Sequence, residues 1–162
     1  MWSAKLWPRP GNELHAPQDA NYSYVLTTYR LTELHCGGVS TRVTPHTAEL
    51  QPEAFVEISL ELAQELGVGN LDWTVLSTAR GEIEVKALVT QRLRPLLIDG
   101  KLVHEVGMPW VFGWEGYARG AIANVLLAIH GDPNTSIHTT KALTCAVRKG
   151  RLLPSAKAVA HV

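Results

Sequence analysis

The sequence predicts a domain built mainly of β-strands with short helices. The strongest signal is a β-hairpin over residues 72–90, where apolar and polar residues alternate along the chain. Other apolar runs, such as 22–28, are short and rich in β-branched and aromatic residues, which is typical of strands. Thirteen glycines and nine prolines supply the frequent turns that short strands require.

The first half of the domain is expected to contain strands over 22–28 and 55–58, followed by a helix over 60–66. Ser59 is placed to cap that helix and Gly67 to end it. The hairpin then follows, and apolar residues share one face of its second strand: Ile83, Val85, Ala87 and Val89. The other face is charged, as in an antiparallel part of a barrel or sandwich.

The second half is less regular. We expect a strand over 101–106, an irregular loop over 107–116, a helix over 118–129 and a final strand over 142–147. Outside the domain, which spans 22–150, the sequence predicts an N-terminal arm over 1–21 and a tail over 151–162. The arm is interrupted by prolines, and its Trp2, Leu6 and Trp7 are expected to pack on this domain or on a partner.

The composition is that of one folded domain. The 162 residues are 46% hydrophobic and 19% charged, which is enough to bury a core without disulfide bonds. Fifteen basic and fifteen acidic residues cancel, which disfavours a nucleic-acid-binding protein, because such proteins usually carry a basic excess. No run of 18 apolar residues occurs and the N-terminus is not typical of a secretory signal, so we expect no membrane span.

Recognisable catalytic motifs are missing. The sequence has no phosphate-binding loop, no glycine-rich dinucleotide motif and no close cluster of metal ligands. Two cysteines, Cys36 and Cys145, cannot hold an iron–sulfur cluster without outside ligands. His35 next to Cys36 is compatible with half a metal site or a nucleophile pair, although neighbours in a strand point to opposite faces. These features leave the function unnamed.

Three segments carry a family resemblance in their order and spacing. The first is Leu-Thr-Thr-Tyr-Arg over 26–30, continued by Gly37-Gly38 and Thr41-Arg42. The second is Ala-Glu-Leu-Gln-Pro-Glu over 48–53, and the third joins Gly-Met-Pro-Trp, Ala-Asn, Gly-Asp-Pro-Asn and Lys-Ala between 107 and 142. Together they resemble the C-terminal molybdopterin-dinucleotide-binding domain of formate dehydrogenase catalytic subunits, in the molybdopterin oxidoreductase superfamily.

The resemblance implies a double-psi β-barrel of about six strands. It also implies a molybdopterin guanine dinucleotide cofactor with molybdenum or tungsten, bound jointly with the rest of an enzyme. No residue of this chain is expected to be catalytic or to ligate the metal. The implied cofactor-binding residues are Thr28, Tyr29, Arg30, Leu31, His35, Cys36, Asn124, Thr140 and Lys141.

Each implied contact has an alternative without a ligand. Arg30 can donate two hydrogen bonds to a phosphate, or it can form a surface salt bridge. Thr28 can be an edge-strand residue, and Lys141 a solvated lysine. Asn124 is placed to meet a purine or pterin edge. Trp110 is expected to pack in the core or the loop rather than against a ligand.

The chain also departs from the family pattern. Leu34 and Val111 stand where the family commonly has histidine, and Ala121 stands where it tends to have aspartate. Each change removes a polar group from the surface that is expected to face the cofactor.

Two functions of different class follow from the resemblance. The first is a component of a formate dehydrogenase that is inactive alone, with a partner catalytic chain carrying the metal ligand and the iron–sulfur cluster. The second is a degenerate, non-catalytic cofactor-binding or assembly protein; a small stand-alone enzyme is a weaker third. We expect a cytoplasmic protein, or a periplasmic one if it is exported with its partner. Self-association through the arm or the Trp110–Trp114 loop is also expected.

Overall fold

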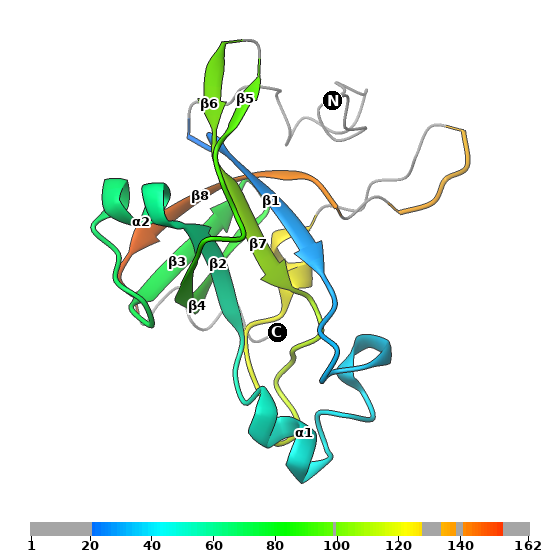
Figure 1. Ribbon diagram of the computed structural model, residues 1–162. Coiled ribbons are helices and arrows are strands. Elements are labelled where there is room, and N and C mark those ends of the chain that lie inside the picture. Colours follow the sequence, from blue (N-terminus) through cyan, green and yellow to red (C-terminus); the bar gives the residue numbers. More distant parts are fainter. Residues whose placement is uncertain (1–20, 99, 128–133, 139–140, 154–162) are drawn as a thin grey trace.

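The computed structural model describes residues 21–98, 100–127, 134–138 and 141–153. Strands dominate it, and the helices are short (Figure 1). The elements in chain order are β1 (Tyr24–Tyr29), η2 (Cys36–Gly38), α1 (Pro45–Leu50), β2 (Phe55–Ser59), α2 (Leu60–Leu66), β3 (Trp73–Thr78), β4 (Gly81–Thr90), β5 (Leu96–Ile98), β6 (Lys101–Val103), β7 (Glu105–Pro109), η3 (Ala123–Leu126) and β8 (Leu143–Lys149).

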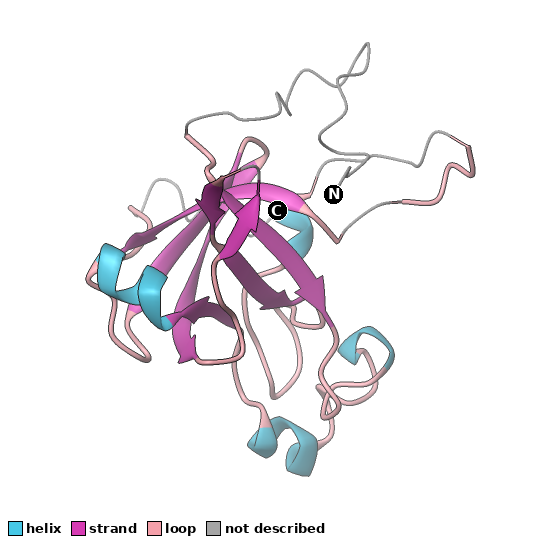
Figure 2. Ribbon diagram, turned by 45° about the horizontal axis from the view of Figure 1, so that its top comes forward, coloured by secondary structure: helices cyan, strands magenta, loops and turns pink. Residues whose placement is uncertain are grey.

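Six of the strands close into a barrel in the order β1-β7-β2-β4-β3-β8. Two neighbouring pairs are parallel, β1 with β7 and β2 with β4, and the other pairs are antiparallel. The strands enclose the interior and the short helices lie outside it (Figure 2). This arrangement confirms the expectation of a mainly β, double-psi β-barrel.

Alternation along the strands fills the barrel with apolar side chains, because every second residue faces inward. The largest fully buried side chains on the barrel strands are Leu26, Val56, Ile58, Val75, Leu76, Ile83, Val85, Val106 and Met108. Leu34, Val111, Ala118 and Leu126 join the same core from segments between the strands. The interior is therefore packed, and any ligand must bind outside it or at one of its ends.

The local predictions of the first half are confirmed. β3 and β4 form the expected hairpin, with Thr78 paired to Gly81 across the turn. Ser59 caps α2, since its side chain accepts a hydrogen bond from the backbone N–H of Leu62 at 3.1 Å. Gly67 ends the helix in the left-handed region, with φ of 62°.

The predicted helix over 118–129 is wrong for the residues that the structure describes. Only η3 forms there, because Gly120 packs directly on Ala54 and its N–H donates to the Gly113 carbonyl at 3.0 Å. A Cβ at position 120 would overlap the side chain of Ala54, so this tertiary contact overrides the helical pattern. Residues 128–129 lie outside the described part of the chain.

Other differences are smaller. The expected strand over 101–106 is divided at His104 into β6 and β7, and 107–109 extend β7 instead of starting a loop. β5 and α1 were not expected. The predicted arm, with Trp2, Leu6 and Trp7, lies outside the described residues apart from Asn21. Among the residues described, no helix has the length and apolarity that crossing a bilayer requires.

Candidate functional site

The end of β1 gathers most of the candidate residues. Thr28 and Tyr29 are the last two residues of β1 and pair with Met108 and Pro109 of β7. The Trp110 N–H donates to the Tyr29 carbonyl at 3.1 Å, which holds the next segment against the strand end. Thr28 is buried with the inward-facing residues, whereas Tyr29 lies on the outer surface of the barrel.

A pocket of about 290 Å³ lies on this outer surface. Three of the predicted residues, Tyr29, Arg30 and Leu31, line it together with side chains that the sequence did not single out, notably Gln51, Glu57 and Arg92. β1, β2 and the segment after β4 thus contribute to one concave surface. The structure therefore brings residues that are far apart in the sequence to a single candidate binding site.

Glu57 is the buried charge of this pocket, with only 4% of its surface exposed. Its carboxylate accepts a hydrogen bond from the Arg92 guanidinium, which is itself mostly exposed. Glu57 is paired in register with Gly107 of β7, and the ring of Tyr29 lies close to that glycine. A Cβ at Gly107 would come 3.0 Å from Tyr29 Cε1, so glycine leaves the room that the phenol ring needs.

The electrostatics keep the Tyr29 phenol neutral. Burial raises the pKa of Tyr29, the nearby Glu57 carboxylate raises it further, and Arg92 only partly offsets these effects. The hydroxyl lies near the Glu57 carboxylate and the Arg92 guanidinium, and it is buried without a hydrogen-bond partner among the described residues. A buried O–H without a partner favours a ligand that can accept its hydrogen bond.

Lys141 lies at the same end of β1. Its Nζ donates to the Thr28 carbonyl at 2.6 Å, which ties the segment before β8 to the end of the first strand. One of the three ammonium donors is used in this bond, and the charge is thereby placed beside the candidate site. This bond brings two of the predicted residues, Thr28 and Lys141, together.

Arg30 stacks rather than pairing with an acid. Its guanidinium carbon lies 5.8 Å from the centroid of the Trp110 ring. Among the described residues it forms no salt bridge, unlike the surface role considered as its alternative. The Trp110 ring also packs over Gly37, where a Cβ would come within 3.4 Å of it. Trp110 therefore supports the loop and orients the Arg30 charge.

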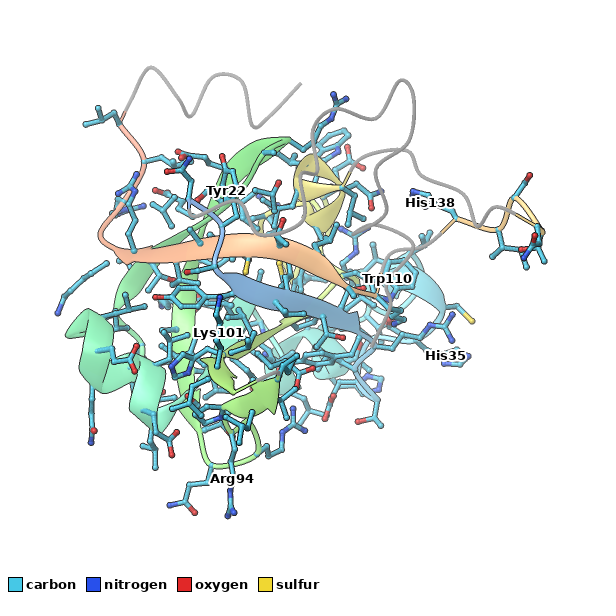
Figure 3. The ribbon with its side chains drawn as sticks, turned by 90° about the horizontal axis from the view of Figure 1, so that it is seen from above. Tyr22, His35, Arg94, Lys101, Trp110 and His138 are labelled. Carbon is cyan, nitrogen blue, oxygen red and sulfur yellow. The ribbon has the colours of Figure 1, made fainter. Side chains whose placement is uncertain are left out.

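His35 and Cys36 are exposed at the start of η2 (Figure 3). Cys36 has a positive φ of 47°, which an ordinary side chain rarely adopts. No group of three or more His, Cys, Asp or Glu side chains suited to a metal occurs within the described ranges. The two residues lie close to the Trp110 side of the site but do not line the pocket.

Two further predicted residues are not brought into the pocket. Asn124 is exposed on η3, which is held to β3 by a hydrogen bond from Thr78 Oγ1 to the Leu126 carbonyl at 2.9 Å. Thr140 lies outside the described residues. Both remain predictions that rest on the resemblance.

Arg42 is a structural residue that local patterns did not reveal. Its guanidinium donates to the Gly38 and Glu115 carbonyls at 3.2 and 3.1 Å, and its own carbonyl accepts from Tyr117 N–H at 2.7 Å. A Cβ at Gly113 would overlap this guanidinium. Arg42 thus holds the η2 segment against the loop after β7. The family resemblance included Thr41-Arg42, but it did not indicate this contact.

The positions that depart from the family pattern are packed. Leu34 and Val111 are fully buried members of the core, and Ala121 packs against it. Their apolar side chains therefore contribute to the core, and none of the three lines the pocket. The donors of the site come instead from Arg30, Tyr29, Arg92 and Lys141.

The chain is similar in sequence to known proteins. The chain is 45% identical over 131 residues to formate dehydrogenase 2 subunit alpha (cytochrome c-553) of Nitratidesulfovibrio vulgaris, covering 81% of this chain and 13% of that protein. It is 42% identical over 132 residues to formate dehydrogenase subunit alpha of Megalodesulfovibrio gigas, with the same two coverages. The chain therefore spans about an eighth of the length of these relatives.

Acetylene hydratase from Pelobacter acetylenicus has a similar fold, with a TM-score of 0.60 at 14% identity over 81% of this chain and 19% of that one. The family model described as "Molydopterin dinucleotide binding domain" matches residues 24–144, which include the strands β1 to β7 and the first two residues of β8. The chain belongs to the molybdopterin dinucleotide-binding domain family.

Proposed function

We propose that the chain holds one arm of a molybdopterin guanine dinucleotide carrying molybdenum or tungsten, as a component of a formate dehydrogenase. The observation that carries the proposal is the pocket at the end of β1, where the donors of Tyr29, Arg30 and Arg92 meet in a chain of this family. The relatives named formate dehydrogenase support formate as the substrate of the whole enzyme.

The residues fit such a cofactor. Its phosphates are anionic and its pterin and purine edges need hydrogen-bond partners, and the site offers the Arg30 guanidinium, the remaining donors of Arg92 and the Tyr29 phenol. Two carboxylates also line the pocket: Glu57, which is buried and paired with Arg92, and Glu33. A pocket of about 290 Å³ is too small for a whole pterin dinucleotide, so the domain covers only part of it.

On this proposal, this chain binds and orients part of the cofactor, and the catalytic chain carries out the reaction. When bound, the metal of the cofactor supplies the two-electron chemistry that oxidises formate to carbon dioxide. Arg30 and Arg92 bind and orient anionic groups, Tyr29 donates a hydrogen bond, and the packed core behind them excludes water. We assign the metal ligand and the iron–sulfur cluster to a partner catalytic chain, and we expect no turnover by this chain alone.

The alternative, a degenerate assembly protein, was motivated by Leu34, Val111 and Ala121. These side chains stabilise the interior, and the donors around the pocket are present. We therefore retain cofactor binding as the single proposed function.

The test is purification of the protein from its native host, with metal and pterin measured by mass spectrometry. We expect molybdenum or tungsten, pterin and a heavy catalytic chain to co-elute with it. Arg30→Gln should lower the bound pterin at least tenfold, because it removes the charge that pairs with the anionic group. The fold should be unchanged, since within the described part of the chain Arg30 is exposed and is held by its stacking on Trp110. Arg80→Gln, an exposed residue in the β3–β4 turn, is the matched control. A bare chain without pterin or partner would contradict the proposal.

A further inference from the structure

The β5–β6 hairpin projects from the barrel (Figure 1). It carries exposed apolar side chains. Leu97 and Leu102 are 72% and 69% exposed, and they are paired across the two strands, so they share one face. Leu96 and Ile98 are also exposed, on the opposite face. An isolated two-stranded hairpin is marginal in water, and one with two apolar faces is expected to be covered.

The root of the hairpin is fixed. The His104 carbonyl, directly after β6, accepts a hydrogen bond from Val25 N–H at 3.0 Å. Its ring is buried, with Nε2 3.1 Å from Glu65 Oε1 of α2, and it meets the Tyr24 ring edge-on. Because these contacts fix the start of the hairpin on the barrel, less conformational entropy is lost when a partner binds its apolar side chains.

Both legs of the hairpin lead to the candidate cofactor pocket. Arg92, which lines the pocket, lies four residues before β5 begins, and Gly107, which faces Tyr29 and Glu57, lies four residues after β6 ends. A partner that covers the pocket is thus within reach of the hairpin. Exposed Arg94 and Lys101 flank the apolar residues, and Figure 3 shows Arg94 pointing away from the barrel.

We propose that the hairpin is the docking surface for the catalytic chain of the formate dehydrogenase, through an apolar patch with acidic groups at its rim. The inference rests on the proposed function. It is carried by the uncovered apolar hairpin, its continuity with the pocket and the length of the relatives, of which this chain spans 13%. Basic residues at the rim favour a partner surface of opposite charge.

The experiment compares tagged wild-type protein with the double variant Leu97→Ser/Leu102→Ser, both expressed in the native host. The catalytic chain that is captured is identified and quantified against the bait by mass spectrometry. We expect at least a tenfold loss in the double variant and no loss in Leu153→Ser, which removes a leucine that is also 72% exposed but lies after β8. Circular dichroism should show that all three proteins are folded.

Charge reversal provides a second measurement. Arg94→Glu/Lys101→Glu should reduce capture about threefold to tenfold, and the reduction should shrink as salt is added, because exposed charges are screened. Equal capture by wild type and the double leucine variant would overturn the inference and leave the proposed function standing. Absence of the catalytic chain from the wild-type sample would overturn both.

Other occupants give other results, and each would also overturn the inference. If the hairpin binds a second copy, sedimentation of the isolated wild type will show a dimer that the double leucine variant loses. If residues 1–20 of the same chain cover it, their removal will raise the hydrogen exchange of 96–103 without changing capture.

Discussion

The barrel strands and the segments that close the end at β1 are stabilised in different ways. In the barrel, six strands share backbone ladders and a continuous apolar interior, so its stability comes from one shared core. We call the end of the barrel where β1 stops, with residues 30–42 and 110–120, the closed end. These residues form almost no strand pairs and depend on a few contacts made by Arg42, Trp110 and the glycines that face them. The Lys141 bond holds the end of β1 itself. A change in the barrel core should therefore lower the stability of the whole domain, whereas a change at the closed end should act through the loss of one particular contact.

The largest effect is expected in the barrel core. Ile58 is fully buried in β2, so Ile58→Ala should lower the free energy of unfolding by about 2–5 kcal/mol through lost burial and the cavity left behind. Urea denaturation measures this loss, provided that the dependence of the free energy of unfolding on urea concentration is the same in both proteins. Leu153→Ala, at an exposed position, serves as the control. A cost below about 1 kcal/mol would show that the core adapts and would weaken the contrast.

A glycine pair tests the closed end. Gly38 has φ of 78° and a Cβ there would overlap the Val111 carbonyl, whereas Gly67 has φ of 62° with open space around it. Gly67→Ala should cost about 1 kcal/mol from backbone strain alone. Gly38→Ala should cost at least about 2 kcal/mol, since the overlap adds to the strain. Equal costs in thermal or urea unfolding would mean that the η2 segment moves freely.

Lys141→Met should have a smaller effect on stability. It removes the hydrogen bond to the Thr28 carbonyl but keeps the aliphatic stem, and we expect a loss of about 1 kcal/mol because Lys141 is exposed. Hydrogen exchange of residues 28–31 should rise in the variant. Unchanged exchange there, with the barrel amides as reference, would show that Lys141 does not hold the site.

The smallest effect is expected in the pH dependence of stability, through an ion pair on the surface of the domain. Hydrogen bonding from Lys149 lowers the pKa of the exposed Asp72 carboxyl, helped by the Gly69 N–H. A lowered folded-state pKa contributes stability above the ordinary value of about 3.9, and this contribution is lost as the pH falls through the lowered pKa. Asp72→Asn should flatten the wild-type decrease in thermal midpoint below about pH 4. Parallel curves would exclude the ion pair as a source of stability.

The same contrast explains what the sequence could predict. The β3–β4 hairpin and the Ser59 cap follow from patterns a few residues long, and both formed as expected. The hydrogen bond between Lys141 and Thr28 joins residues 113 positions apart, and no local pattern encodes it. The family resemblance placed Tyr29, Arg30 and Leu31 in one site. The contribution of Glu57 and Arg92 emerged only from the structure, through the register of β2 and the ion pair between the two residues. The helix over 118–129 failed because one glycine contact outweighed its periodicity.

The position of β8 in the barrel has a consequence for biosynthesis. This last strand closes the barrel between β1 and β3, to which it is hydrogen-bonded on either side. Until residues 143–149 have left the ribosome, β1 and β3 present open edges that can pair with other chains. Translation that stops before residue 143 therefore yields an aggregation-prone product, and a ribosome pause before that point lengthens the time during which chaperones must protect it.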